Sequence, residues 1–356
     1  MTFIAEDLAR TAREWNRGEF EVFSPARSVF IGRVRTARLL IVSDIHYAGA
    51  TERARAGFEH RAVDDAATRM LLRFYRRFIW LAEPTEQGHL LDQFIARAGE
   101  PDLVVANGDF SCDSAFVGVS DDAACASAVE CLGRLRGAFG GRFAATIGDH
   151  ELGKTSLVGN KGGMRLASWE RTLGELQLKP AWRVDIGRYA LLGVTSTLVG
   201  LPVFVRDILP GEHPAWDKLR AQHLAEVRDL FAGVEEGRRI VLFCHDPSAL
   251  PFLAADEVVR AKLPMVEQTI VGHLHSNLFL SLSRLLAGMP PVSMFGKSIE
   301  RYSVALNRAR HWRPFNVRLC PALPGIQLLN DGGFYEVELD TEAMRPAKFT
   351  FRPLPR

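Results

Sequence analysis

Residues 38–46, RLLIVSDIH, join a run of aliphatic side chains to a polar pair, Asp44 and His46. A short apolar run that ends at a polar cluster is typical of a buried strand. The pattern recurs four times. The runs and the clusters that follow them are 103–106 with GD at 108–109, 143–147 with GDHE at 148–151, 240–243 with CHDP at 244–247, and 269–271 with GHLH at 272–275.

Helical patterns lie between these strands. In residues 62–81, Met70, Phe74, Phe78 and Leu81 recur at helical spacing, and similar patterns cover 123–135 and 219–231. Further strand-like runs are 189–194, 334–339 and, less clearly, 29–34. The alternation predicts an α/β fold. No repeat or linker divides the chain, so we expect one domain over 1–356, with its core at about 28–275 and 320–342.

Composition excludes several classes of protein. The 356 residues are 47% hydrophobic and 24% charged, with a net charge of +2, which argues against disorder and against nucleic-acid binding by the whole surface. Five cysteines without a CxxC pair favour a reducing compartment. There is no secretory signal pattern and no apolar stretch long enough to span a bilayer. We therefore expect a cytoplasmic protein.

The polar clusters predict a metal site. The carboxyl ends of strands in an open α/β sheet converge on one crevice. The residues that would meet there are Asp44, His46, Asp109, Asp149, His245, His273 and His275. Carboxylates and imidazoles suit manganese, iron or zinc better than calcium. Seven ligands are too many for one ion, whereas two divalent ions would use them all and form the clamp typical of phosphoester hydrolysis.

Each motif also has a plain structural interpretation. DxH after a strand often arises by chance, and GDHE would serve equally as a turn followed by a helix N-cap. GHxH is more specific, because its glycine permits a tight turn. The occurrence of all five in order, each after a strand, favours the metal site.

The order DxH, GDxxD, GN-H-(D/E), H, GHxH, found here across residues 44–275, resembles that of the calcineurin-like metallophosphoesterases. The resemblance implies a four-layer α/β/β/α sandwich of two mixed sheets. It implies that Asp44, His46 and His275 hold one metal, that position 149, His245 and His273 hold the second, and that Asp109 bridges them. A metal-bridging hydroxide would then attack phosphorus, while His150 protonates the leaving oxygen or stabilises charge on the transferred group. Asp109 and His150 are thus the expected catalytic residues, with manganese as the first choice of metal and iron or zinc as alternatives.

One position departs from the family pattern. Asp149 stands where the family has asparagine, so the site gains a third carboxylate beside Asp44 and Asp109. A further negative charge lowers the Lewis acidity of the metals. We expect a higher pKa for the bridging water and an alkaline optimum, or a preference for a more highly charged ion. The alternative is a catalytically impaired metal-binding scaffold.

Residues 276–318 predict an amphipathic cap. They hold seven basic residues, one acid and many apolar side chains. Such a segment would cover a substrate, lie on anionic lipid headgroups, or simply pack on the sheet. Arg284 and Arg301 in it, and Lys154 in the loop after GDHE, are candidate substrate-binding residues, although that loop would equally be solvated.

The substrate expected from the cap is anionic and partly apolar. A phosphodiester or a lipid-linked pyrophosphate fits, as in the family members that cleave UDP-diacylglucosamine in lipid A synthesis. A cyclic-nucleotide or general phosphodiesterase, or a phosphomonoesterase, remains open because the metal centre is shared. Contact with the inner face of a membrane through 276–318 stays open beside the packed cap, a nucleic-acid partner is not expected, and the sequence makes no prediction of oligomeric state.

Overall fold

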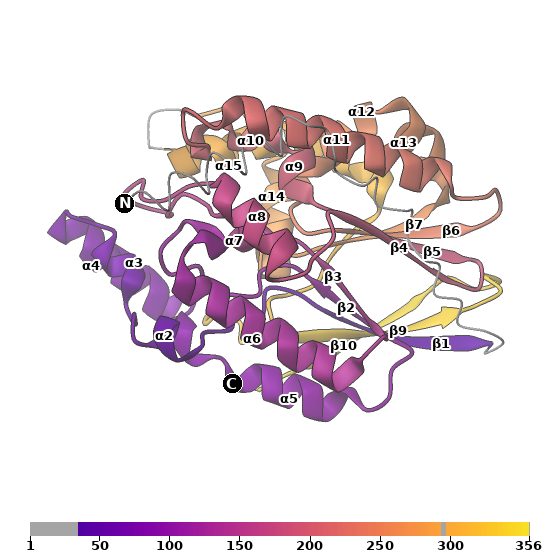
Figure 1. The fold of residues 1–356 in the computed structure, drawn as a ribbon, viewed down its shortest axis with the longest axis horizontal. Coiled ribbons are helices and arrows are strands. Elements are labelled where there is room, and N and C mark those ends of the chain that lie inside the picture. The colour runs from indigo at the N-terminus through magenta and orange to yellow at the C-terminus, as the bar shows by residue number, and fades with distance from the viewer. Residues whose placement is uncertain (1–34, 293–296, 356) are drawn as a thin grey trace, which may run out of the picture.

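Two mixed five-stranded sheets face each other in the structure, a computed structural model that describes residues 35–292 and 297–355 (Figure 1). The strand orders are β10-β9-β1-β2-β3 and β4-β5-β6-β7-β8. The strands are β1 Thr36–Val42, β2 Leu103–Asn107, β3 Phe143–Thr146, β4 Ala181–Ile186, β5 Tyr189–Val194, β6 Arg239–Cys244, β7 Val266–Val271, β8 Val317–Leu319, β9 Gly333–Asp340 and β10 Lys348–Pro353. Strands β1 to β3 are parallel, as are β5 to β8, and β4, β9 and β10 run antiparallel to their neighbours.

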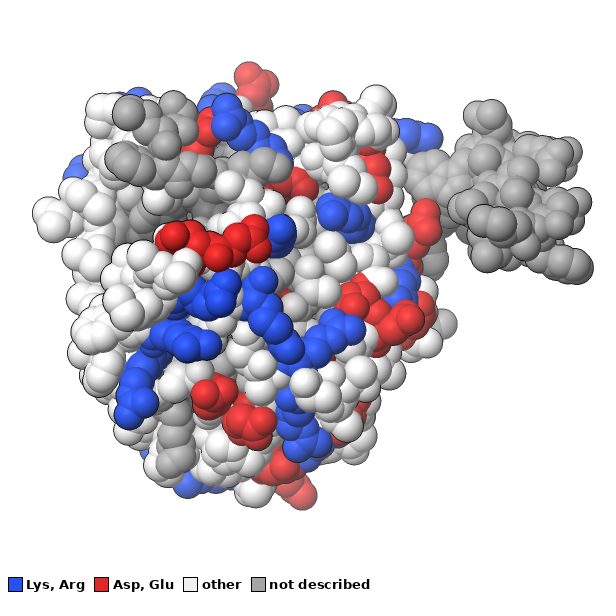
Figure 2. Space-filling model, turned by 90° about the vertical axis from the view of Figure 1, so that its left-hand side faces the viewer, with Lys and Arg blue, Asp and Glu red and all other residues white. Residues whose placement is uncertain are grey.

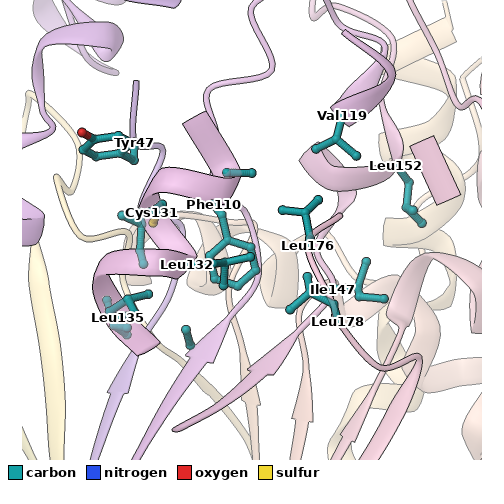
Figure 3. Packing of buried hydrophobic residues seen from close by; sticks show 14 of the residues in the cluster. Tyr47, Phe110, Val119, Cys131, Leu132, Leu135, Ile147, Leu152, Leu176 and Leu178 are labelled. Carbon is teal, nitrogen blue, oxygen red and sulfur yellow. The ribbon is translucent and has the colours of Figure 1, made fainter. Parts of the chain in front are cut away.

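The alternation of side chains along β1 shows how the layers form. Leu39 and Ile41 pack between the two sheets, whereas Leu40 and Val42 point to the opposite face, because successive side chains of a strand lie on opposite sides. On that opposite face lies α6 (Asp122–Phe139), whose Leu132 lies beside Phe110 (Figure 3). The second sheet is covered in the same way by α11 (His213–Ala232), α12 (Leu250–Ala255) and α13 (Glu257–Lys262). The order of layers is therefore helices, sheet, sheet, helices.

The helices follow the strands along the chain. They are α2 Ala50–Arg53, α3 Phe58–Arg61, α4 Ala66–Phe78, α5 His89–Ala98, α6 Asp122–Phe139, α7 Asp149–Leu152, α8 Leu166–Gly174, α9 Ser196–Val199, α10 Leu201–Phe204, α11 His213–Ala232, α12 Leu250–Ala255, α13 Glu257–Lys262, α14 Asn277–Leu285 and α15 Lys297–Arg308. None of those helices, all drawn from residues 35–292 and 297–355, has the length and hydrophobicity needed to cross a bilayer.

The predicted α/β fold with two mixed sheets is confirmed. The run 29–34 lies outside the described residues, and three strands, β4, β8 and β10, were not expected. Strand β10 extends the core past residue 342. The segment 276–318 forms α14 and α15 but then enters the second sheet as β8, so its last residues belong to the core. The helix predicted over 62–81 is α4, but its Met70, Phe74 and Phe78 are exposed, while Leu81 is buried.

Candidate metal centre

The ends of five strands bring the seven predicted residues together. Asp44 and His46 follow β1, Asp109 follows β2, and Asp149 opens α7 just after β3. From the second sheet, His245 follows β6, and His273 and His275 follow β7. Because these strands are parallel within each sheet, their carboxyl ends share one edge.

Five of these residues adopt left-handed backbone conformations. Their φ angles are 49° at Asp44, 47° at His46, 59° at Asp109, 56° at His273 and 60° at His275. Non-glycine residues in this region are strained, and such strain concentrates at functional sites. Backbone hydrogen bonds hold the turns, including Asp44 N to Gly108 O and His46 N to Asp109 O, both 3.1 Å.

Two glycines allow the strand ends to approach each other closely. A Cβ atom at Gly272 would lie 2.1 Å from Ser43 Oγ, and one at Gly108 would lie 2.7 Å from His245 Nδ1. Neither space admits a side chain. The glycine of GHxH is therefore required by the packing of the two sheets at this edge, in addition to any effect on the turn.

Asp44, His46 and His275 form the first group of potential ligands. His275 Nε2 lies 3.3 Å and His46 Nε2 lies 3.9 Å from Asp44 Oδ1. The two imidazole rings stack, with their Nε2 atoms 3.4 Å apart. Two nitrogens and a carboxylate oxygen thus face one small volume.

Asp109, Asp149, His245 and His273 form the second group. His245 Nε2 is 3.2 Å from both Asp109 Oδ2 and Asp149 Oδ1, and His273 Nδ1 is 2.8 Å from Asp149 Oδ1. Asp109 also belongs to a third group, with His46 and His150. Among the described residues, Asp109 therefore joins the second group to His46 of the first.

Three carboxylates are buried together at this site, and their negative charges favour a bound cation. Asp44, Asp109 and Asp149 are almost fully buried, and burial raises the pKa of Asp44 to about 6. Burial also opposes ionisation of Asp109, but His150 and His245 keep its pKa well below the usual value. Asp109 Oδ2 lies 3.2 Å from His245 Nε2, and Asp149 Oδ2 lies 3.3 Å from Lys154 Nζ. Buried carboxylates and imidazoles gathered at such distances fit divalent metal ions.

His150 lies beside both groups. Its Nε2 is 3.7 Å from Asp109 Oδ2, and its ring centroid is 4.6 Å from that of His46. Burial lowers the pKa of His150 well below the usual value. A neutral imidazole can still donate one N–H bond, so His150 is suited to stabilise charge on an oxygen.

Glu151 organises the loops, a role that its place in GDHE did not reveal. Its Oε2 accepts hydrogen bonds from Gly148 N at 2.8 Å and Asp109 N at 3.1 Å, and its Oε1 accepts one from Phe110 N at 2.8 Å. One buried carboxylate thereby ties the loop after β2 to the loop after β3. The only sequence signal for it was the acid three residues after Gly148, as in a capping box.

Replacing Glu151 with glutamine should lower the free energy of unfolding by about 3 kcal/mol, because the amide turns an NH₂ group towards backbone donors and leaves at least one of them unsatisfied. Urea denaturation in EDTA would measure the loss. Glu170→Gln, a change at an exposed position of α8, is the matched control and should have little effect. Equal midpoints for both variants would contradict this role of Glu151.

Lys154 pairs with the residue that departs from the family pattern. Its Nζ lies 3.3 Å from Asp149 Oδ2. Burial opposes ionisation of Asp149, yet His273 and Lys154 keep its pKa well below the usual value. Asp149, the third carboxylate of the site, is therefore paired with the ammonium group of Lys154. No sequence pattern indicated this pair.

A cavity of about 420 Å³ opens beside the metal ligands. His46, His150, His273 and His275 line one part of it. Much of the remaining wall is apolar and comes from Phe58, Trp80, Phe116, Phe279, Leu306 and Trp312. Two candidate substrate-binding residues, Lys154 and Arg301, also line the cavity. Arg284 is not among the lining residues, and its guanidinium donates to Val317 O.

A buried His/Asp set at the edge of two facing mixed sheets is the arrangement expected of a metal-dependent phosphoesterase. A family model described as calcineurin-like phosphoesterase matches residues 37–277. The chain belongs to the calcineurin-like phosphoesterase family and carries a candidate dinuclear metal site.

Two solved structures resemble this chain. A purple acid phosphatase from yellow lupin (Lupinus luteus) seeds shares 10% identity at a TM-score of 0.35, covering 71% of this chain, which spans only 39% of the lupin chain. The phosphopantetheinyl hydrolase PptH from Mycobacterium tuberculosis shares 14% identity at a TM-score of 0.31, with 68% of this chain and 84% of that chain covered. A search of the curated proteins finds no match. The family assignment rests on the match over residues 37–277.

Proposed function

We propose that this metal-dependent phosphoesterase hydrolyses a phosphodiester or pyrophosphate bond in a substrate that is partly apolar, such as a lipid-linked (pyro)phosphate of the UDP-diacylglucosamine type. The observation that carries the proposal is the cavity, in which the histidines of the candidate metal centre and a mainly apolar wall face the same space. A phosphate group placed at the histidines leaves the rest of the substrate against aromatic and aliphatic side chains.

We assign one metal ion to each of the two groups of ligands described above. Asp44, His46 and His275 would hold one ion, Asp149, His245 and His273 the other, and Asp109 would lie between them, with manganese as the preferred metal and iron or zinc as alternatives. Such ions supply Lewis acidity and ionise water near neutral pH. His150, neutral and beside Asp109, would donate a hydrogen bond to an oxygen of the transferred group.

Lys154 and Arg301 would orient the phosphate. Both line the cavity, where each is already paired with a carboxylate, Lys154 with Asp149 and Arg301 with Asp207. Their paired acids hold the cations in place, so little side-chain entropy is lost when an anion binds. Helices α14 and α15 of the segment 276–318 complete the wall, which supports its proposed role as a cap. All five cysteines are free thiols, which supports the reducing, cytoplasmic location expected from the sequence.

Hydrolysis of methyl and decyl p-nitrophenyl phosphodiesters, with manganese and with EDTA, tests this function. We expect metal-dependent turnover of both and a kcat/KM at least about tenfold higher for the decyl ester, since each buried methylene contributes about 0.8 kcal/mol. Phe279→Ser, in the cavity wall, should reduce turnover of the decyl ester alone. Leu285→Ser, a change at an exposed residue of the same helix outside the cavity lining, is the matched control.

The other functions give different results. Equal kcat/KM for both esters would favour a general phosphodiesterase, and faster hydrolysis of p-nitrophenyl phosphate would favour a phosphomonoesterase. Preferential hydrolysis of a cyclic nucleotide would favour that substrate class. Bound metal without turnover of any of these would favour the metal-binding scaffold.

A further inference from the structure

Helix α4 presents its apolar side chains to solvent. Leu72 is its only buried residue, whereas Met70, Leu71, Phe74 and Phe78 are between 51% and 71% exposed. At about 100° per residue these four side chains fall within one arc of about 100°. Large exposed apolar groups side by side on one helix are uncommon in a soluble protein and mark an interaction surface.

The same helix is strongly basic. Arg69, Arg73 and Arg77 lie along the flank of the apolar arc, and no acid occurs within Ala66–Phe78. The fourth arginine, Arg76, is instead directed inward, where it pairs with Glu59 and lines the cavity. Figure 2, which looks onto the left-hand end of Figure 1 where α4 lies, shows Lys and Arg side chains across the middle of this face, with groups of Asp and Glu among them.

The apolar arc continues to the mouth of the cavity. Tyr75 of α4 lines the cavity, as do three side chains that are also exposed, Leu157, Ile299 and Tyr302. These three come from the loop after α7 and from α15. Exposed apolar side chains from separate elements therefore line the cavity that also contains histidines of the candidate metal centre.

We propose that α4, together with Leu157, Ile299 and Tyr302, docks the mouth of the cavity onto the surface of an anionic lipid bilayer. Apolar side chains beside arginines, on a helix that projects from the end of the fold (Figure 1), match a surface whose acyl region is covered by negative headgroups. A second copy of the chain fits less well, because a two-fold contact through α4 would bring together two arginine-flanked surfaces with no acid within Ala66–Phe78 to pair with them. This docking surface stands on α4 itself and does not rest on the proposed reaction.

Co-sedimentation with vesicles tests the proposal. The two vesicle preparations are phosphatidylcholine alone and two parts phosphatidylcholine to one part phosphatidylglycerol. We expect the full chain to bind the anionic vesicles at least about tenfold more strongly than the neutral ones, and added salt to weaken the binding. Phe74→Ser with Phe78→Ser should lower the partition coefficient at least about tenfold. Arg73→Gln with Arg77→Gln should lower it by about fivefold for each charge on anionic vesicles.

A matched control replaces exposed apolar residues elsewhere. Val129→Ser with Met344→Ser, on α6 and in the β9–β10 connection, should bind vesicles as the wild type does. Equal binding by the α4 variants, or none by the wild type, overturns the proposal. So does a dimer in solution that the phenylalanine variant dissociates, because a second copy then covers the face. Turnover of the methyl ester in the same preparations separates the two proposals: hydrolysis without vesicle binding overturns docking alone, and binding without hydrolysis contradicts only the proposed reaction.

Discussion

Asp109→Asn should reduce kcat by at least about a thousandfold and lower the metal content from two ions to one per chain. Asp109 is the residue shared between the ligand group that contains Asp149 and the group that contains His46 and His150. Loss of its charge would remove the link between the two ions, and an ion contributes several kcal/mol of charge stabilisation to phosphoryl transfer. Metal analysis by mass spectrometry and hydrolysis of bis(p-nitrophenyl) phosphate measure the two effects separately.

Asp113→Asn is the matched control for this variant. Asp113 is also buried and lies four residues after Asp109. Its Oδ1 accepts hydrogen bonds from Val117 N at 3.0 Å and Gly118 N at 2.9 Å. Asp113 belongs to none of the potential ligand groups found among the described residues. Asparagine can accept both bonds, so turnover should stay within about threefold of the wild type. Two bound ions and near-normal turnover in Asp109→Asn would contradict the role assigned to Asp109.

Lys154→Met should lower kcat/KM by about thirtyfold, which corresponds to about 2 kcal/mol. Without the ammonium group 3.3 Å from Asp149 Oδ2, three buried carboxylates would share the site and the third would lose the cation that pairs with it. Adding Asp149→Asn to this variant removes the excess negative charge, and we expect activity to recover in part, because the contribution of Lys154 to orienting the phosphate stays lost. Such a recovery would show that the two substitutions are energetically coupled, because independent substitutions would lower the activity additively.

The pH–rate profiles of the single variants give an independent check. Loss of the positive charge in Lys154→Met should shift the optimum to higher pH, and loss of the negative charge in Asp149→Asn should shift it to lower pH. Lys161→Met, in the same loop but 4.0 Å from the exposed Asp64, is the control and should leave the profile unchanged. Strictly additive effects of Lys154→Met and Asp149→Asn would show that the pair does not act as a unit. Lys154 also reduces the alkaline shift that the extra carboxylate alone would cause.

The strands that were predicted share a simple signal. Uninterrupted aliphatic runs such as 39–42 and 240–243 are buried on both faces of their sheets, which is the pattern of a central parallel strand. Strand β4 was missed because Arg183 and Asp185 interrupt it, and these two side chains pair with each other at 3.0 Å. Strand β8 has only three residues. Helical spacing in 62–81 correctly predicts a helix, but periodicity alone does not say whether its apolar arc faces the core or solvent.

The candidate site was predictable in outline for a topological reason. The carboxyl ends of parallel strands lie at one edge of a sheet, so the polar residues that follow the strands are expected to lie close together. The pairing of Asp149 with Lys154 and the three backbone bonds of Glu151 depend on the path of the loops. That path is set by strained residues such as Asp109 and by the close approach at Gly272, neither of which leaves a local sequence pattern.

The left-handed turns at Asp44, His46, Asp109, His273 and His275 restrict how this centre can evolve. Only glycine, asparagine, aspartate and histidine adopt that conformation at modest cost, and of these only the last three offer a ligand atom. A change to cysteine or glutamate at any of these five positions would strain the backbone as well as alter the ligand chemistry. Position 149 has no such backbone constraint, so a substitution there would change the ligand set without straining a turn.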